Sequence, residues 1–94
     1  MADVRIDVTI PSLLADCAGG RSSFSLEAGT LAGALEALRQ TYPLLRHHMY
    51  DEQGNLRQHV VIFFNGGNTR WLDSLDVRLE TGGRIEVLQA VSGG

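Results

Sequence analysis

The sequence predicts an α+β domain in which a mixed sheet of four to five strands packs one face against one main helix. Three patterns predict it: alternating apolar and polar residues near both ends of the chain, one stretch with helical spacing, and one run that is apolar on both sides. A chain of 94 residues supports one hydrophobic core and not two. We therefore expect one domain over residues 1–90, followed by a flexible C-terminal diglycine tail over residues 91–94.

Two alternating stretches predict an N-terminal hairpin. Apolar and polar residues alternate over residues 4–10, which is the period of a strand with one buried and one wet face. The alternation returns over residues 22–26, with Phe24 and Leu26 facing inward. The segment between them, residues 15–21, contains two adjacent glycines and predicts a turn.

Residues 30–41 have the spacing of an amphipathic helix, with apolar side chains at positions 31, 34, 35 and 38. Thr30 is the expected N-cap, because its hydroxyl can accept a hydrogen bond from a free backbone N–H of the first turn. Pro43 disfavours helical geometry in the residue before it, so the helix is expected to end there. A further short turn is expected over residues 44–49, followed by a polar loop over residues 51–55.

The C-terminal half predicts the remaining strands. Residues 59–64 are apolar on both sides, as in a central strand. After a turn at residues 65–68, a short strand over residues 69–72 is expected to pair back. Residues 73–79 are expected to hold a small turn or a single helical turn, and the last strand is expected over residues 84–89.

This order of elements is that of the β-grasp, or ubiquitin-like, fold. Because a single helix covers only one face of a sheet, the other face of the strand at residues 59–64 is expected to stay partly open. We expect Val61 and Phe63 to belong to a partner surface there. The alternative is that the loop at residues 68–72 folds over this face, with Trp71 as part of the core or as its cover.

Composition excludes several classes of partner. The formal net charge is -3 and the arginines are scattered, so no nucleic-acid partner is expected. No apolar run approaches the roughly 20 residues that cross a bilayer, so no membrane partner is expected, and the N-terminus lacks the pattern of a secretory signal. Since Cys17 is the one cysteine, a reducing compartment is expected, namely the cytoplasm.

The basic residues are all arginines, eight in number. The chain therefore offers no lysine to an isopeptide bond. We expect that it could donate its carboxyl in a conjugation reaction but could not accept one through a lysine. An arginine bias that merely reflects a GC-rich coding sequence is the alternative explanation.

Two consecutive glycines, Gly93 and Gly94, end the sequence. Glycine beyond a last strand adds no packing and has a large conformational entropy, so its presence needs another reason. A segment without side chains can be threaded through a narrow channel, and four residues extend roughly 13 Å at about 3.3 Å per residue. The tail therefore predicts a carboxylate that reaches into the active site of another protein, with a linker remnant as the alternative.

Three segments, taken in order, carry a family resemblance: G-T-L-A-G-A-L-E-A-L from Gly29, V-I-F-F-N-G-G from Val61, and G-G-R-I-E-V-L-Q-A-V-S-G-G from Gly82. Over nearly the whole domain, the chain resembles the ThiS/MoaD family of ubiquitin-like sulfur carriers, whose members end in Gly-Gly directly after the last strand. The D-x-x-G-x-L-R loop from Asp51 to Arg57 is most similar to the longer carriers that donate sulfur in cysteine biosynthesis.

The resemblance implies a carrier protein that is itself no catalyst and binds no cofactor. A partner adenylating enzyme of the ubiquitin-activating type would use ATP to activate the Gly94 carboxylate, and a sulfur source would convert it to a thiocarboxylate. Gly93, Ser92 and Val91 would be threaded through the partner's channel. A cysteine-synthase-like enzyme would accept the sulfur. A metalloprotease is a further implied partner, although a sequence ending at Gly94 is expected to need no trimming.

Two other functions stay open. The chain could be the small subunit of a molybdopterin-synthase-type complex, with its tail inserted in a large subunit. It could also be a ubiquitin-like modifier that is joined through Gly94 to lysines of other proteins. In both cases the diglycine remains the working end of the chain.

The remaining candidate residues have simpler interpretations. Cys17 has no neighbouring base in the sequence and is expected to be a plain small residue. Surface positions are expected for the three histidines, His47, His48 and His59, because no spacing of cysteines or carboxylates completes a metal site with them. The glycine pairs at residues 66–67 and 82–83 are expected to be turns, since neither opens a helix in a phosphate-binding pattern.

Overall fold

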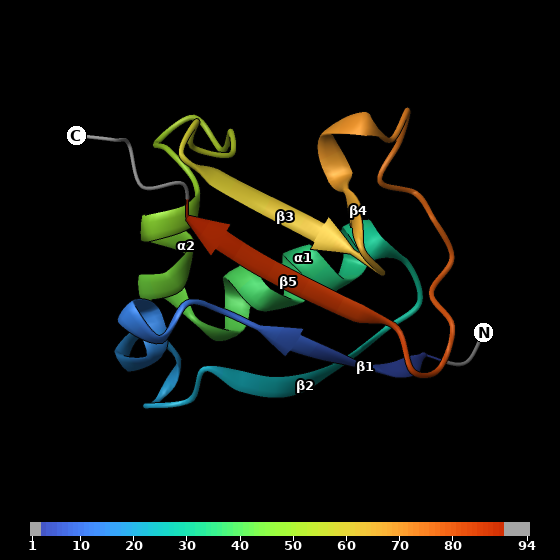
Figure 1. Ribbon diagram of the computed structural model, residues 1–94, viewed down its shortest axis with the longest axis horizontal. Coiled ribbons are helices and arrows are strands. Elements are labelled where there is room, and N and C mark those ends of the chain that lie inside the picture. Colours follow the sequence, from blue (N-terminus) through green and yellow to red (C-terminus); the bar gives the residue numbers. More distant parts are fainter. Residues whose placement is uncertain (1–2, 90–94) are drawn as a thin grey trace.

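A computed structural model of the chain describes residues 3–89. Strands and helices form one layer of sheet with helices against it (Figure 1), which confirms the predicted α+β class. Along the chain the elements are β1 (Val4–Thr9), the 3₁₀ helix η1 (Ser12–Ala18), β2 (Ser23–Ala28), α1 (Leu31–Thr41), α2 (Pro43–Met49), β3 (Val60–Phe64), β4 (Gly67–Asn68), the 3₁₀ helix η2 (Thr69–Trp71) and β5 (Arg84–Gln89).

The sheet has five strands in the order β2-β1-β5-β3-β4. β1 and β5 are parallel, whereas the other neighbouring pairs are antiparallel. β5 is therefore the central strand and is paired on both sides. Because β1 and β5 run in the same direction, Thr9 and Gln89 lie toward the same end of the sheet, the end near η1 and α2 (Figure 1).

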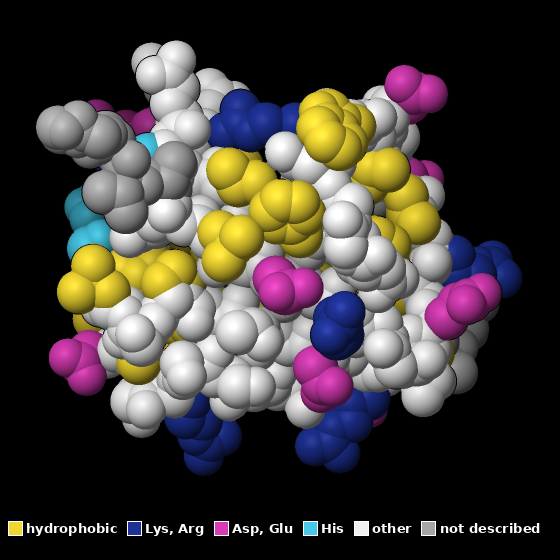
Figure 2. All heavy atoms as spheres, viewed as in Figure 1, with side chains coloured by type: hydrophobic (Ala, Val, Ile, Leu, Met, Phe, Trp, Pro, Cys, Tyr) yellow, Lys and Arg dark blue, Asp and Glu magenta, His cyan; other side chains and the backbone are white. Residues whose placement is uncertain are grey.

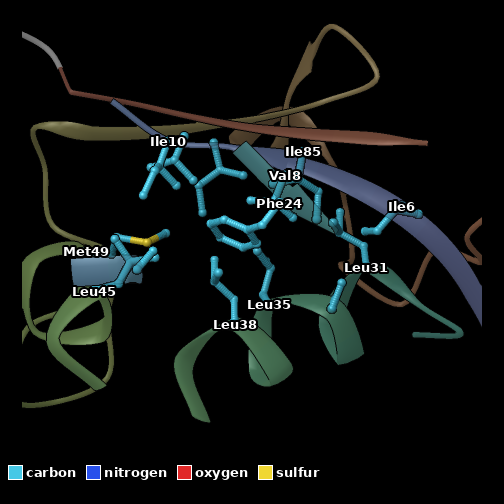
Figure 3. Close-up of a cluster of buried hydrophobic side chains, with 14 of the residues drawn as sticks. Ile6, Val8, Ile10, Phe24, Leu31, Leu35, Leu38, Leu45, Met49 and Ile85 are labelled. Carbon is cyan, nitrogen blue, oxygen red and sulfur yellow. The ribbon is translucent and has the colours of Figure 1, made fainter. Parts of the chain in front are cut away.

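The inner face of the sheet packs against α1 to form the core. Alternation places Ile6 and Val8 of β1 and Val60 and Ile62 of β3 on this face, and all four are at most 1% exposed. Figure 3 shows the side chains of β1 and β5 facing those of α1, with two side chains of α2 at one end of the cluster. Burying each large aliphatic side chain contributes about 1.5–3 kcal/mol relative to leaving it in water.

The main helix begins where the sequence predicts. Thr30 Oγ1 accepts a hydrogen bond from the backbone N–H of Gly33 at 3.0 Å, as expected of an N-cap. The last helical residue is Thr41, and Pro43 then opens α2 as its first residue, a position where the missing N–H costs nothing. α2 is a seven-residue helix whose Leu45 and Met49 are buried, where the sequence suggested only a short turn.

The strand predicted over residues 69–72 is wrong. A two-residue turn at Asn65-Gly66, with φ of 51° and 87°, closes the hairpin early, so β4 occupies Gly67–Asn68. The Asn68 side chain then accepts a hydrogen bond from Arg70 N at 2.9 Å and starts η2. A local side-chain cap therefore wins over continued strand pairing.

Two further segments differ from the predictions. No helical turn forms within residues 73–79; this segment instead runs past the start of α1, where Leu31 N and Ala32 N donate to Val77 O and Leu75 O at 2.8 and 2.9 Å. It thus satisfies N–H groups that a helix leaves unpaired. Between β1 and β2, where a turn was predicted over residues 15–21, η1 precedes the turn and buries Leu14 and Ala18. No helix within residues 3–89 is long and apolar enough to span a bilayer.

Candidate functional site

The candidate site is the end of the sheet at which β5 ends, because the predicted tail follows β5 in the sequence. Gln89, the last described residue, pairs with Val60 at the start of β3. On the other side, η1 follows β1 at the same end of the sheet. The predicted tail residues Val91, Ser92, Gly93 and Gly94 lie outside the described residues. The structure does describe the C-terminal end of β5 and the segments around it, which we call the base of the tail.

The loop before β3, residues 51–57, lies next to this end of the sheet. Asp51 Oδ1 accepts hydrogen bonds from the backbone N–H groups of Gln53 and Asn55, both at 2.9 Å. Gly54, at φ 85°, completes the turn in a conformation that favours glycine. Tyr50 and Leu56 form an isolated β-bridge that closes the loop. The D-x-x-G-x-L-R pattern therefore encodes a closed, hydrogen-bonded turn.

Two arginines fasten this loop to its surroundings. Arg57 Nε donates to His47 O at 3.2 Å, at the C-terminal end of α2. Arg70 Nη2 donates to Val60 O at 3.0 Å and to Arg57 O at 3.3 Å, so η2 is held against the start of β3. The strand that pairs with the last described residue of β5 is thus anchored from two sides. Neither contact was predicted from the sequence, because each joins segments whose proximity depends on the fold.

The outer face of β3 and β5 carries apolar side chains. Val61 and Phe63 are half-buried and alternate with the core residues of β3. Val61 pairs with Leu88, which is 46% exposed, so these two side chains lie on the same face. Figure 2 shows hydrophobic side chains gathered over β3 and the segment that follows β4. We call Val61, Phe63 and Leu88 the outer apolar patch.

Trp71 neither belongs to the core nor covers the sheet. It is 81% exposed, so the expectation that Trp71 itself belongs to the core or to its cover is wrong. In η2, Thr69 is the buried residue, and a 3₁₀ turn that faces one residue inward turns another outward. Leu88 and Leu13, which is 83% exposed in η1, are exposed apolar residues that were not predicted from the sequence. Leu88 could have been found from the alternation of residues 84–89.

The outer face of β1 and β2 is polar. Ser25 Oγ donates to Asp7 Oδ1 at 3.3 Å, and Asp7 also pairs across the sheet with Arg84. Arg5 lies opposite Glu27 in the same register. Polar residues and residues of opposite charge thus lie opposite one another along this half of the face, in contrast to the apolar half.

The helical side of the molecule carries a groove of about 800 Å³ between α1, α2 and the loop after α2. Arg39 lies over the Tyr50 ring, 4.8 Å from its centroid, and pairs with Glu36. This hydrogen-bonded arginine lowers the pKa of the Glu36 carboxyl, and burial raises the pKa of the Tyr50 hydroxyl. Arg39 is thus paired with both Glu36 and the Tyr50 ring. The described side chains that line the groove do not combine a nucleophile with a general base.

The other sequence candidates occupy plain positions. Cys17 is half-buried in η1 and packs against the core. As expected, all three histidines are exposed. Within residues 3–89, no three histidine, cysteine or carboxylate side chains come together closely enough to hold a metal ion. Gly66 and Gly82 both lie in turns at positive φ, as the glycine pairs predicted.

A five-stranded mixed sheet, a main helix on one face and the last strand at the centre of the sheet define a class, the ubiquitin-like β-grasp proteins. Solved structures support this. The structure resembles the small archaeal modifier protein 1 from Methanosarcina acetivorans, with a TM-score of 0.79 and 27% identity, and each chain is covered completely. It also resembles CysO from Mycobacterium tuberculosis, with a TM-score of 0.77 and 27% identity, covering 92% of this chain and 99% of the other.

Sequence comparison narrows the class to a family. The chain matches the ThiS family over residues 8–94 and belongs to that family. It is 28% identical over 93 residues to proteins named sulfur carrier protein CysO from Mycobacterium bovis and Mycobacterium tuberculosis, covering 97% of this chain and 100% of theirs. The predicted β-grasp fold and the predicted ThiS/MoaD family are thereby confirmed.

Proposed function

We propose that this chain is a sulfur carrier whose Gly94 carboxylate is adenylated and then converted to a thiocarboxylate. The observation that carries the proposal is the family match, which extends through the diglycine to Gly94 and covers nearly all of the chain. The similarity to the CysO sulfur carriers points in the same direction. The chain itself then acts as a protein substrate of two partner enzymes.

The chemistry needs two steps at one carbon atom. A carboxylate oxygen of Gly94 attacks the α-phosphorus of ATP, and pyrophosphate leaves, which produces an acyl adenylate. A sulfur nucleophile from the sulfur source then attacks the acyl carbon, and AMP departs with the bonding electron pair. The resulting thiocarboxylate is a sulfur nucleophile attached to a protein, so free sulfide need not diffuse to the acceptor. Both steps take place in partners, because carboxylate activation requires a bound nucleotide.

The tail provides the reach for this chemistry. Gly94 stands five positions beyond Gln89, which corresponds to roughly 16 Å when the chain is extended at about 3.3 Å per residue. Gly93, Ser92 and Val91 are small enough to pass through a narrow channel in the adenylating enzyme. The anchored start of β3 gives this tail a rigid origin, so little orientational freedom is lost in the body of the carrier on binding.

The outer apolar patch is the proposed docking surface for the adenylating enzyme of the ubiquitin-activating type. Val61 and Phe63 lie on the strand that pairs with the last described residue of β5, and Leu88 lies on β5 itself. A partner that covers this patch therefore meets the tail at its base. Exposed Trp71 extends the apolar surface, and aromatic side chains often dominate binding energy at interfaces.

The sulfur acceptor is proposed to be an enzyme of cysteine biosynthesis or of another sulfur metabolite. The resemblance of the Asp51 to Arg57 loop to the longer carriers of cysteine biosynthesis supports the first. A cysteine-synthase-like enzyme and a metalloprotease are the corresponding partners. We place the cycle in the cytoplasm, where a thiocarboxylate and the single Cys17 stay reduced.

Intact mass spectrometry tests the proposal. The chain is incubated with a cognate adenylating enzyme, ATP and sulfide, and the expected product is heavier by the difference between sulfur and oxygen. Tandem fragmentation should place the change at Gly94. Omitting ATP is the control and should leave the mass unchanged. An unchanged mass in the complete reaction, with an enzyme that activates another carrier, would contradict the proposal.

A second candidate function is protein modification. It is favoured by the resemblance to the small archaeal modifier protein 1, which extends over the full length of both chains. In this case Gly94 would be joined to lysine side chains of other proteins. Tagged chain expressed in its host should then produce high-mass conjugates that disappear when Gly94 is deleted. If no conjugates form and a thiocarboxylate is found at Gly94, protein modification is excluded and the sulfur-carrier function remains.

A further inference from the structure

The basic side chains around the base of the tail are guanidinium groups. All eight basic residues of the sequence are arginines, so the 94 residues contain no side-chain amine. Two of them, Arg57 and Arg70, hydrogen-bond to the segment that leads into β3. A lysine ammonium can also donate to a carbonyl oxygen. The hydrogen bonds alone therefore do not explain why arginine, and not lysine, occupies these positions. A difference in chemical reactivity between the two side chains can explain it.

An activated carboxyl can reach this neighbourhood. Val60 is paired with Gln89, which puts their Cα atoms about 5 Å apart. Val60 N donates to Arg57 O at 3.0 Å, a turn that brings those two Cα atoms within about 7 Å. Arg57 is thus within roughly 12 Å of the point where the tail starts, and the five residues to Gly94 extend about 16 Å. Position 57 is within reach of the chain's own C-terminal carboxyl.

The opposite end of the domain is out of that reach. β1 runs parallel to β5, with Asp7 opposite Arg84, so Asp3 lies nine residue steps behind Gln89 along the strand direction. At about 3.3 Å per residue this separation is roughly 30 Å. Arg78, which bridges to Thr30 beside the end of β2, belongs to the same distant end.

The absence of side-chain amines near the tail matters because an acyl adenylate reacts with amines. A neutral amine attacks the acyl carbon, a C–N bond forms, AMP leaves with the electron pair of the broken C–O bond, and the nitrogen loses a proton to water. Only about one lysine in a thousand is neutral near pH 7.4, but a short tether supplies a millimolar or higher local concentration. Guanidinium remains protonated and has no free lone pair.

We propose that the tail-bearing end of this domain excludes amines, so that the activated Gly94 carboxyl cannot acylate its own carrier. The inference rests on the proposed function, since it requires Gly94 to become an acyl electrophile. Self-acylation would form an internal amide, which is stable and ends the carrier cycle. With arginine at every basic position, the domain keeps its positive charges and its hydrogen bonds to carbonyl oxygens without that side reaction.

The test replaces enzymatic activation with a chemical one. The chain is prepared as a Gly94 thioester by thiol cleavage of an intein fusion, in a Cys17→Ser background that removes thioester exchange with the chain's own thiol. Arg57→Lys and Gln58→Lys place an amine near the tail, and Arg78→Lys is the matched control at the distant end. Each sample is kept dilute in mildly alkaline buffer, and circular dichroism checks that each variant is folded.

The parent and Arg78→Lys are expected to hydrolyse to the free acid. Arg57→Lys and Gln58→Lys are expected to lose the thiol without adding water, at least about tenfold faster than Arg78→Lys, and peptide mapping should join the new lysine to Gly94. If both near-lysine variants only hydrolyse, or if Arg78→Lys cyclises equally fast, the inference is wrong. Because no adenylating enzyme is used, this result is independent of the mass test of the proposed function.

Discussion

The outer face of the sheet has two halves with different chemistry. Over β1 and β2 it carries paired polar and charged side chains, such as Asp7 with Ser25 and Arg84. Over β3 and β5 it carries half-buried Val61 and Phe63 and exposed Leu88. The two halves share one sheet and one core, so backbone architecture does not explain the difference. We therefore propose the half over β3 and β5 as the one that contacts a partner.

The largest predicted effect separates the two faces of β3. Ile62→Ala removes a side chain that is 1% exposed on the inner face, and we expect a loss of about 2–5 kcal/mol in the free energy of unfolding. Val61→Ala, one residue away on the outer face, should cost about 1 kcal/mol or less. Urea unfolding followed by circular dichroism measures both. Equal losses would show that the outer apolar patch is part of the core.

The next effect concerns binding. Phe63→Ala should weaken affinity for the adenylating enzyme by about 2 kcal/mol, or roughly 30-fold, if the outer apolar patch is the docking surface. Ser25→Ala on the polar half is the matched control and should change affinity less than about twofold. Isothermal titration calorimetry with the folded variants gives both constants. An unchanged affinity for Phe63→Ala would break the proposed distinction between the halves.

Arg70 tests the anchoring of the apolar half. Arg70→Met removes two hydrogen bonds to backbone carbonyls while keeping much of the aliphatic stem. We expect a loss of about 1–2 kcal/mol in the free energy of unfolding. Amide hydrogen exchange should become faster near Val60, because the start of β3 loses a support. Exchange rates that stay unchanged there would show that the clamp does not hold this strand.

The smallest effect is expected on the polar half. Arg5→Gln removes one partner of an exposed cross-strand pair with Glu27. Such pairs contribute about 0–1 kcal/mol, so the unfolding midpoint in urea should hardly move. Affinity for the adenylating enzyme should also stay within about twofold of the parent. A large fall in affinity would show that the polar half over β1 and β2 also contacts the partner, which contradicts the proposal.

Local patterns predicted much of the fold. The N-cap at Thr30 and the break at Pro43 correctly bounded α1, and the alternation of β5 matched residues 84–89. The half-exposed positions of Val61 and Phe63 also followed from the period of a strand covered on one side. These features depend on neighbouring residues alone, which is why the sequence suffices for them.

Two kinds of feature were not predicted. The Asn68 cap is local, but it competes with strand pairing, and it replaced a predicted strand with η2 and left Trp71 exposed. The Arg70 bonds to Val60 and Arg57 join η2 to the loop before β3, and no sequence period signals such a contact. The tail at residues 91–94 lies outside the described residues, so its predicted role remains a prediction.

The adenylation of Gly94 is the central claim, and pyrophosphate exchange tests it most directly. The chain and its Gly94→Ala variant are each mixed with a cognate adenylating enzyme, ATP and labelled pyrophosphate. The parent should support exchange, and the variant should unfold at the same temperature yet exchange at least about 100-fold more slowly, because an added methyl group misplaces the carboxylate in its channel. Equal exchange by the two chains would contradict a tail threaded to Gly94.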